Sequence, residues 1–550
     1  MFILLILSSL YKIHAMADGS ISSSAEISRG NPAPGWVRWI LPSAADLIFV
    51  AVLTSLVFTA LSVRLLGDAG IGWHIRTGQQ ILATHAIPHA DSFSASMAGK
   101  PWFAWEWLYD VTVGWLDRIA GLNGVVWLTA LGIAAVFAWL FRLLVIRGTN
   151  FFFALLLTLL ALSASTIHFL ARPHVWSWLF TLAWFWILDS TERNTLLGLH
   201  DRRDRSLWLL PVLMMIWANV HGGFLLGFVL LGIFWLSALW ILLTAKKSRI
   251  ESVALWFAAR KRLRRLTWLG LVSVLASLVN PYGWKLYQHI YSYLTDSFLM
   301  DHIDEFQSPN FHGIAQKCFL ALLLVAMAVL AVGGRELRLS SLLVALFAVY
   351  AGLTASRNLP ISAILLAMIA GPLVPAIGLF DQFAEEKSVI ESGLTRHLWP
   401  AIAVLATFVI ATHGGRVGSD QIMNAHFGPK RMPVEAVNYL LAHDIVGPVL
   451  APDYWGGYLI YRLYPRVRVV VDDRHDFYGP EFLKFYVRMI HVEQGWQDFL
   501  QEQQPRCILL PRNSALANIL LKTNGWKVIY TDELSIAFVK TGNPDLYDGT

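Results

Sequence analysis

A carboxylate, an imidazole and a guanidinium lie close together early in the chain, in the segment GDAGIGWHIRTG. Asp68 directly follows an apolar run, and His74 and Arg76 come one to two helical turns later. A carboxylate at the edge of a membrane can accept a proton from a hydroxyl group, so Asp68 is a candidate general base. His74 and Arg76 are candidates for lining the same cavity. Alternatively, Asp68 caps the next helix, because Asp before small residues is typical of helix starts.

Two further carboxylates follow in the same loop, in the segments IPHADSFSAS and KPWFAWEWL. Asp91 and Glu106 are therefore further catalytic candidates, as a second acid or as a metal ligand. Each also has a simpler explanation. Asp91 in ADSFS has the sequence of a turn, and Glu106 among tryptophans can accept a hydrogen bond from an indole.

Polar residues recur at the ends of later apolar runs, in ARPHVW, WANVHGG, NPYGWK and SRNLP. Because guanidinium groups suit phosphate and charge is costly near lipid, these residues are candidates for binding a phosphate: Arg172, Arg357, His174 and Lys285. His221 and Asn280 are candidates for the cavity wall. The alternative is that these side chains only reach toward the membrane surface. The histidines are not at a metal-binding spacing, so a divalent metal is compatible with such a site but no ligand motif indicates one.

The composition predicts that lipid surrounds most of these elements. The 550 residues are 56% hydrophobic and 15% charged and include 24 tryptophans, a balance that leaves a water-soluble globule too little polar surface. The formal charge of +6 does not indicate nucleic-acid binding, because the basic residues cluster in short loops between apolar runs. Cys318 and Cys507 provide no disulfide framework.

Apolar runs long enough, or nearly long enough, to cross a bilayer predict about eleven transmembrane helices. They cover residues 45–66, 122–145, 151–171, 174–188, 207–220, 224–243, 266–279, 315–332, 339–355, 359–379 and 397–412. Residues 1–44 are predicted to be a flexible cytoplasmic leader, with the start at Met1 or Met16 left open.

The distribution of Lys and Arg predicts the orientation of the chain. The basic excess on one set of loops places the N-terminus inside and, with an odd number of spans, the C-terminus outside. We therefore expect a multi-pass protein of the bacterial inner membrane with a first periplasmic loop over 67–121. That loop ends in WFAWEWLYDVTVGWLDRIAG, which predicts an interfacial helix. The basic loop 246–265 is predicted to lie along the anionic cytoplasmic leaflet.

Residues 414–550 predict a periplasmic α/β domain. Helical patterns cover 433–443, 480–491 and 515–522, and strand patterns cover 467–471, 507–510, 526–530 and 535–539. The predicted fold class is thus an α-helical polytopic membrane protein with a C-terminal periplasmic α/β domain. Nucleotide sugars are not supplied to the periplasm, so lipid-linked substrates are the expected donors.

This arrangement resembles the type C glycosyltransferase superfamily, which uses polyprenyl-phosphate sugars and includes protein mannosyltransferases and oligosaccharyltransferases. The resemblance implies that Asp68 in the first outer loop is the catalytic base. The usual second acidic residue is missing, because Ala69 and Gly70 follow Asp68. In the tail, APDYWGGYLIY is similar to an acceptor-recognition segment of oligosaccharyltransferases, which implies that role for Asp453, Tyr454 and Trp455.

The leading hypothesis is a membrane glycosyltransferase that transfers a sugar from a polyprenyl-phosphate carrier to a periplasmic glycan, lipid or protein acceptor. The alternative is a non-enzymatic transporter or flippase, or a scaffold for lipid-linked envelope saccharides. A transporter is expected to carry ionisable groups near the centres of its spans, whereas the polar residues here gather at the ends. A peptidase or lipase is disfavoured because neither GxSxG nor HExxH occurs in the sequence.

Overall fold

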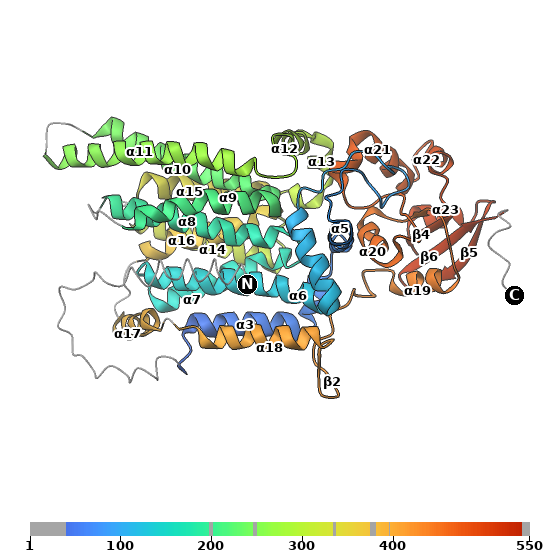
Figure 1. Cartoon of the computed structure of the whole chain (residues 1–550), viewed down its shortest axis with the longest axis horizontal. Helices are drawn as coiled ribbons and strands as arrows, with labels where there is room; N and C mark the ends of the chain where they lie inside the picture. The colour runs from blue at the N-terminus through green and yellow to red at the C-terminus, as the bar shows by residue number, and fades with distance from the viewer. Residues whose placement is uncertain are drawn as a thin grey trace.

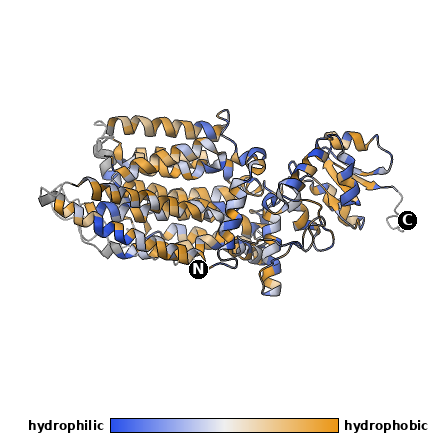
Figure 2. Cartoon of the chain, turned by 90° about the horizontal axis from the view of Figure 1, so that it is seen from above, coloured by the Kyte–Doolittle hydropathy of each residue, from blue (hydrophilic) through white to orange (hydrophobic). Residues whose placement is uncertain are grey.

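The computed structural model describes residues 40–196, 202–245, 250–333, 337–374, 381–394 and 396–541. Long helices run side by side and form a bundle, and a smaller α/β unit lies at one end of it (Figure 1). Hydrophobic residues dominate the bundle, and hydrophilic residues gather at its ends and in the α/β unit (Figure 2). Most of the predicted leader, residues 1–39, lies outside the described residues.

The bundle consists of α3 to α11 and α14 to α18, apart from α5, which lies at the end facing the α/β unit. The helices are α3 (Ala44–Phe58), α4 (Leu61–Leu65), α6 (Trp107–Ile146), α7 (Phe151–Ser165), α8 (His174–Leu196), α9 (Leu209–Val220), α10 (Leu225–Thr244), α11 (Ile250–Ser277), α14 (Ile314–Gly333), α15 (Leu339–Thr354), α16 (Leu359–Ala370), α17 (Asp381–Gly393) and α18 (Leu398–Thr412). Two short helices, α12 (Lys285–Thr295) and α13 (Ser297–His302), lie at the junction with the α/β unit (Figure 1).

Five stretches of the described chain are long and apolar enough to cross a membrane. They are Trp107–Ile146, Phe151–His168, Gly222–Thr244, Ile314–Val332 and Ser356–Leu373. Shorter apolar helices cover Ala44–Phe58, Arg205–Val220, Leu339–Thr354 and Leu398–Thr412. The remaining two predicted runs lie in α8 and α11, which also carry charged residues. Helices thus occur where the sequence predicts them, while the count of eleven crossings stays a prediction.

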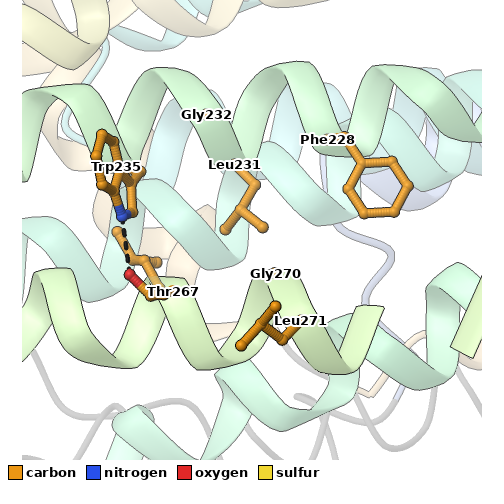
Figure 3. A pocket seen from close by; sticks show the side chains of 8 residues that line it. Phe228, Leu231, Gly232, Trp235, Thr267, Gly270 and Leu271 are labelled. Carbon is orange, nitrogen blue, oxygen red and sulfur yellow. Dashed lines mark hydrogen bonds between the residues drawn. The ribbon is translucent and has the colours of Figure 1, made fainter. Parts of the chain in front are cut away.

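The outer surface of the bundle is apolar, as a lipid-facing surface must be. Large hydrophobic side chains are exposed there, including Trp240, Trp268, Leu275 and Tyr350. A groove of about 280 Å³ opens between α10 and α11, where the Trp235 Nε1–H donates to the Thr267 hydroxyl oxygen at 2.9 Å (Figure 3). No acidic or basic side chain lines this groove. The chain is therefore a multi-pass membrane protein.

The basic segment before the seventh predicted span does not form a separate surface loop. From Ile250 onward, the described part of 246–265 belongs to α11, which runs along α10 (Figure 1). Arg262 is buried and donates from Nη2 to the Leu188 carbonyl oxygen at 3.1 Å. This basic segment is therefore helical and contacts the bundle through the buried Ala259 and Arg262, while Phe257 and Lys261 are exposed; its contact with the anionic leaflet stays a prediction.

The predicted interfacial helix and the second predicted span form one continuous element, α6. Its backbone departs from helical geometry at Gly121, where φ is 57° and ψ is −154°. That left-handed conformation is easily adopted by glycine, so Gly121 allows the helix to change direction between its two halves.

The α/β unit contains a four-stranded sheet in the order β3-β4-β6-β5. Its strands are β3 (Val449–Leu450), β4 (Cys507–Pro511), β5 (Trp526–Thr531) and β6 (Ser535–Lys540), and its helices are α19 (Val434–Ala442), α20 (Asp453–Leu463), α21 (His475–Ile490), α22 (Trp496–Gln503) and α23 (Ala515–Leu520). A small hairpin of β1 (Arg416–Val417) and β2 (Asp420–Gln421) precedes it. The predicted helix from 480 corresponds to the second part of α21, which follows a kink at Gly479, where φ is 75° and ψ is 162°.

The first loop completes the edge of this sheet. The predicted strand 467–471 contributes isolated bridges, in which Val469 pairs with Val449 on one side and with Ser94 on the other. The Ala95 N–H donates to the Val469 carbonyl at 2.7 Å, and the Val469 N–H donates to the Phe93 carbonyl at 3.3 Å. Residues far apart in sequence thus form one sheet edge, which ties the first loop to the tail.

Helix α5 (Ile71–Thr84) of the first loop packs directly on α20 of the tail through glycines. A Cβ added at Gly72 would lie 2.1 Å from the Gly457 carbonyl oxygen, and one added at Gly457 would lie 2.3 Å from the Ala69 carbonyl oxygen. These positions admit no side chain, because the neighbouring atoms belong to backbone that cannot rotate away.

Gly457→Ala is therefore expected to destabilise the protein by roughly 1–3 kcal/mol and to loosen the contact between loop and tail. Gly232→Ala is the matched control, since an added Cβ on that helical glycine meets no atom within 4 Å. Thermal unfolding and limited proteolysis of the purified proteins measure the difference. Equal behaviour of the two variants would contradict the close packing of α5 on α20.

Candidate functional site

The site lies where the bundle meets the α/β unit, and its centre is an arginine shared by two carboxylates. Arg172 precedes α8, and its Nη2 lies 2.6 Å from Asp68 Oδ1 and 2.6 Å from Asp473 Oδ2. Asp68 belongs to the first loop and Asp473 to the tail. The three charged groups therefore connect the three parts of the chain that surround the site.

Local backbone structure holds each of these side chains. The Gly70 N–H donates to Asp68 Oδ1 at 2.8 Å, which closes a turn just before α5; the N-cap of α5 is Gly70 and no side chain caps it, so Asp68 is a turn residue and not the predicted helix cap. The Ala171 N–H donates to the Leu65 carbonyl at 2.7 Å, which fixes the segment that carries Arg172. Asp473 follows the buried segment that pairs with β3. A Cβ at Gly70 would lie 2.3 Å from both Arg172 Nη2 and Asp473 Oδ2, so a glycine at this position makes room for the ion pair.

The two carboxylates differ in their acidity. Burial raises the pKa of Asp68, but the Arg172 charge and hydrogen bond outweigh this and hold it below its ordinary value. Burial also raises the pKa of Asp473, and with the nearby charges of Asp68 and Asp472 it reaches about 6 despite Arg172. Asp68 is thus the carboxylate that stays ionised, and Asp473 is the one that gains a proton first.

Glu106, directly before α6, lies between two histidines. Its Oε2 is 3.8 Å from His74 Nε2, and its Oε1 is 3.8 Å from His221 Nε2. Burial raises the pKa of Glu106 to about 8, against the opposing charge of Arg172. Glu106 therefore carries a proton at neutral pH. It does not satisfy an indole as the alternative proposed, because the Trp107 Nε1–H donates to Asn219 Oδ1 at 2.7 Å.

Both histidines present Nε2 to Glu106, but their Nδ1 atoms have different partners. His74 is fully buried, stacks on Trp73 and has its Nδ1 2.6 Å from Asp110 Oδ1. Burial holds the pKa of His74 well below its ordinary value, so the ring is neutral. Burial also raises the pKa of Asp110 well above its ordinary value, so this pair shares a proton between Nδ1 and the carboxyl group, while Nε2 faces Glu106.

His221 has the opposite arrangement. Its Nδ1 accepts from the Gly223 N–H at 3.1 Å and lies 2.7 Å from Ser177 Oγ, while the Trp217 Nε1–H donates to the same hydroxyl oxygen. The proton of the ring therefore lies on Nε2, which faces Glu106. Glu106 thus lies between the Nε2 atoms of two neutral histidines.

The tail contributes a second set of paired acids and histidines. Asp453, at the start of α20, lies 2.6 Å from His475 Nε2 and accepts from the Tyr486 hydroxyl at 3.1 Å. Asp476 lies 2.9 Å from Nε2 of His289 in α12. Burial tends to raise the pKa of Asp453, but the His475 hydrogen bond and charge hold it below its ordinary value. This set brings α12, α20 and α21 to the same junction.

Several predicted site residues hold other parts of the structure instead. Arg76 donates from Nε to the Tyr461 carbonyl at 2.9 Å, and its guanidinium lies over the Tyr461 ring. Asn280 makes its contacts within its own turn, with Ser277, Tyr282 and Gly283. Neither prediction of a cavity residue is supported, because the polar atoms of both side chains are used by nearby backbone.

Two more predictions from the tail and the outer segment need correction. Trp455 is buried in the core, where its Nε1–H donates to the Arg431 carbonyl at 2.8 Å, while Tyr454 beside it is exposed. Lys285 is exposed at the start of α12, and no described hydrogen bond or ion pair joins it to the site. His289, one turn further along the same helix, makes that connection instead.

Asp91 has the geometry of the turn residue that the alternative predicted. It accepts from the Phe93 and Ser94 N–H groups at 3.2 and 2.9 Å and pairs with Arg474 at 2.8 Å. Its oxygens are saturated, so it serves the contact between the loop and the tail.

His174, which was predicted to bind phosphate, lies next to the site. Its Nε2 is 2.9 Å from the His168 carbonyl oxygen.

Sequence reasoning missed the acidic and basic residues of the segment DDRHDFYG, residues 472–479, which directly follows the predicted strand 467–471. Asp473, His475 and Asp476 all reach the junction, while Asp472 binds Arg474 through both of its oxygens. The signal available was a run of charges directly after a buried strand-like segment, where side chains gather at the end of a sheet. Nothing in the sequence indicated that Arg172 would be their partner.

No protein-family model matches the chain, and no curated protein matches it. Several solved structures, however, match the chain in fold. The apo crystal structure of the Archaeoglobus fulgidus oligosaccharyltransferase matches with a TM-score of 0.52 at 11% identity, covering 91% of this chain and 74% of that one. The chain has the oligosaccharyltransferase fold. The archaeal oligosaccharyltransferase AglB from the same organism, in complex with an inhibitory peptide and a dolichol-phosphate, matches with a TM-score of 0.51, 11% identity and the same coverage.

The proton on Glu106 predicts a pH-dependent stability. In the unfolded chain the pKa of this carboxyl is near 4.5, whereas in the folded protein it is about 8. The folded state therefore holds an extra proton between these values, and stability falls as the pH rises through this range. Glu106→Gln mimics the neutral acid, so its thermal midpoint is expected to lack this part of the pH dependence. The exposed Glu481→Gln is the control and keeps the wild-type slope; the same slope in all three proteins would contradict a protonated Glu106.

Proposed function

We propose that this chain is an integral membrane glycosyltransferase that transfers a sugar from a polyprenyl-phosphate-linked donor to an acceptor at the periplasmic face of the bacterial inner membrane. The observation that carries the proposal is the ion triad of Asp68, Arg172 and Asp473 at the junction of an oligosaccharyltransferase fold. A structural neighbour that binds a dolichol-phosphate and a peptide supports a lipid-linked donor and adds peptides to the acceptor classes to be tested.

Two arginines are proposed to hold the carrier phosphate. Arg172 and Arg357 both exert their charge on Glu106, and we propose that both lie beside the bound phosphate. The Arg357 guanidinium lies 4.6 Å over the centre of the Phe306 ring, which keeps it extended at the end of the bundle. Because the donor lipid is confined to the bilayer, its phosphate lies at the depth of these helix ends. Positive charge at that depth stabilises the phosphate as it leaves.

In the proposed reaction Asp68 is the general base. The oxygen of an acceptor hydroxyl attacks the anomeric carbon and loses its proton to the Asp68 carboxylate. The bond from the anomeric carbon to the phosphate oxygen breaks, its electron pair stays on the phosphate, and the configuration is inverted. The low pKa of Asp68 keeps this group ionised and ready to accept a proton. Glu106, which carries a proton at neutral pH, is the proposed acid for the leaving phosphate.

The start of α20 is proposed to bind the acceptor. The exposed Tyr454 ring lies beside Asp453, whose carboxylate is fixed by His475 and Tyr486. Trp455 supports this turn from the core.

A transporter of lipid-linked saccharides is the less favoured alternative, because hydrophilic residues gather at the ends of the bundle (Figure 2). The acidic Asp189 fits this pattern: it lies toward the end of the bundle far from the tail, where it is paired with Arg147 at 3.1 Å and with Arg338.

Asp68→Asn separates a base from a turn residue, because the Asn side-chain oxygen can still accept from the Gly70 N–H whereas the amide takes up no proton. Sugar transfer from extracted polyprenyl-phosphate donors is expected to fall at least about 100-fold, while the abundance of the protein stays unchanged. Asp296→Asn is the matched control, since Asp296 only caps α13 by accepting from the Phe298 and Leu299 N–H groups. Equal transfer by the two variants would remove Asp68 from the mechanism.

A further inference from the structure

We infer that Arg172 is the fixed cation of this site and occupies the place of a divalent metal, so that sugar transfer requires no metal ion. The claim that transfer requires no metal ion rests on the proposed function. The claim that Arg172 is the cation bound by the two carboxylates does not. Oxygen ligands of two aspartates that meet from distant parts of a chain are what a hard divalent cation binds. Here their meeting point is filled by a guanidinium nitrogen, 2.6 Å from each.

Gly70 explains why the guanidinium fits. The superfamily that the sequence resembles carries a second acidic residue just after the catalytic one, whereas this chain has Ala69 and Gly70. A Cβ at position 70 would lie 2.3 Å from Arg172 Nη2 and 2.5 Å from its Cζ. The Asp473 Oδ2 would lie equally close, at 2.3 Å. A side chain at position 70 would therefore require Arg172 and Asp473 to move, so the glycine at this position favours the ion triad.

The residues present do not fit a divalent metal at this point. Among the residues that the structure describes, no group of three or more His, Cys, Asp and Glu side chains is placed to bind a metal ion. A cation between Asp68 and Asp473 would have to displace Arg172, whose segment is held by the hydrogen bond from Ala171 to Leu65. In this compact network the positive charge of Arg172 is balanced by one carboxylate on each side, Asp68 and Asp473.

The same arginine still has room for a ligand. Its side chain is 24% exposed while Nη2 holds the two carboxylates, and its buried Nε has no hydrogen-bond partner among the described residues. A planar guanidinium presents several donors in fixed directions, which suits the oxygens of a phosphate. Arg172 thus combines two tasks of a metal ion: it orients the carboxylates, and it offers positive charge to the carrier phosphate.

Binding of Mn²⁺, measured by electron paramagnetic resonance on the purified full-length protein, tests the inference without relying on activity. The wild type is expected to bind no Mn²⁺ at this site. Arg172→Ala leaves Asp68 and Asp473 facing each other without a cation and is expected to gain Mn²⁺ binding at least about tenfold tighter than that of the wild type. Arg172→Ala/Asp473→Asn is the matched control and loses this gain. If the alanine variant does not fold, Arg172→Lys is tested in its place. This variant keeps the positive charge and is expected to bind no Mn²⁺.

Transfer by the wild type in excess EDTA provides the second arm, with unchanged rates expected. The inference is overturned if the wild type binds Mn²⁺ and loses it in Asp68→Asn, or if EDTA abolishes transfer and Mn²⁺ restores it. If no condition gives transfer while Mn²⁺ binds to Arg172→Ala and not to the wild type, the proposed function fails and the assignment of the cation stands.

Discussion

The contact of one guanidinium with two carboxylates determines how the parts of this protein meet. Arg172 comes from the bundle, Asp68 from the first loop and Asp473 from the tail, and each charge is partly removed from water. A buried charge is costly unless it is paired, and removing one partner of such a network costs about 3–5 kcal/mol. The three parts therefore hold each other in place at the site.

The neighbouring contacts follow the same pattern of loop against tail. Phe93 to Ala95 pair with Val469 at the sheet edge, and the backbones of α5 and α20 touch at Gly72 and Gly457. Arg474 is buried, binds Asp91 at 2.8 Å, and stacks over Trp102 at 4.7 Å. The tail is thus anchored to the first loop through backbone, charge and aromatic contacts, which makes the relative position of Asp68 and Asp473 well defined.

The positions of the apolar helices could be predicted from the sequence, because the cost of exposing backbone and charge to lipid leaves a strong signal in composition. The packing of α11 along α10 could not be predicted, because the sequence of its basic half is typical of a surface helix. The strand pattern at 467–471 was recognised, but its partner Ser94 lies in a loop with no strand pattern of its own.

The site was predictable in part for a similar reason. Asp68, Glu106, Arg172 and His221 stand out as polar residues at the ends of apolar runs, and the structure brings all four to one junction. Asn280 and Trp455 had the same appearance but are satisfied by backbone nearby. Whether a polar side chain faces a cavity or its own turn is decided by tertiary contacts. Asp473 was missed because its importance depends on Arg172, which is 301 residues away in the chain.

The most direct test of the account is an experimental structure of the protein in a lipid nanodisc with a polyprenyl-phosphate bound. We expect the phosphate to contact Arg172 beside Asp68, at the junction of the bundle and the α/β unit, with the isoprenoid chain running along the bundle. A phosphate bound at the opposite end, beside Arg147 and Arg338, or a lipid held only in the groove between α10 and α11, would contradict a transferase site at the junction.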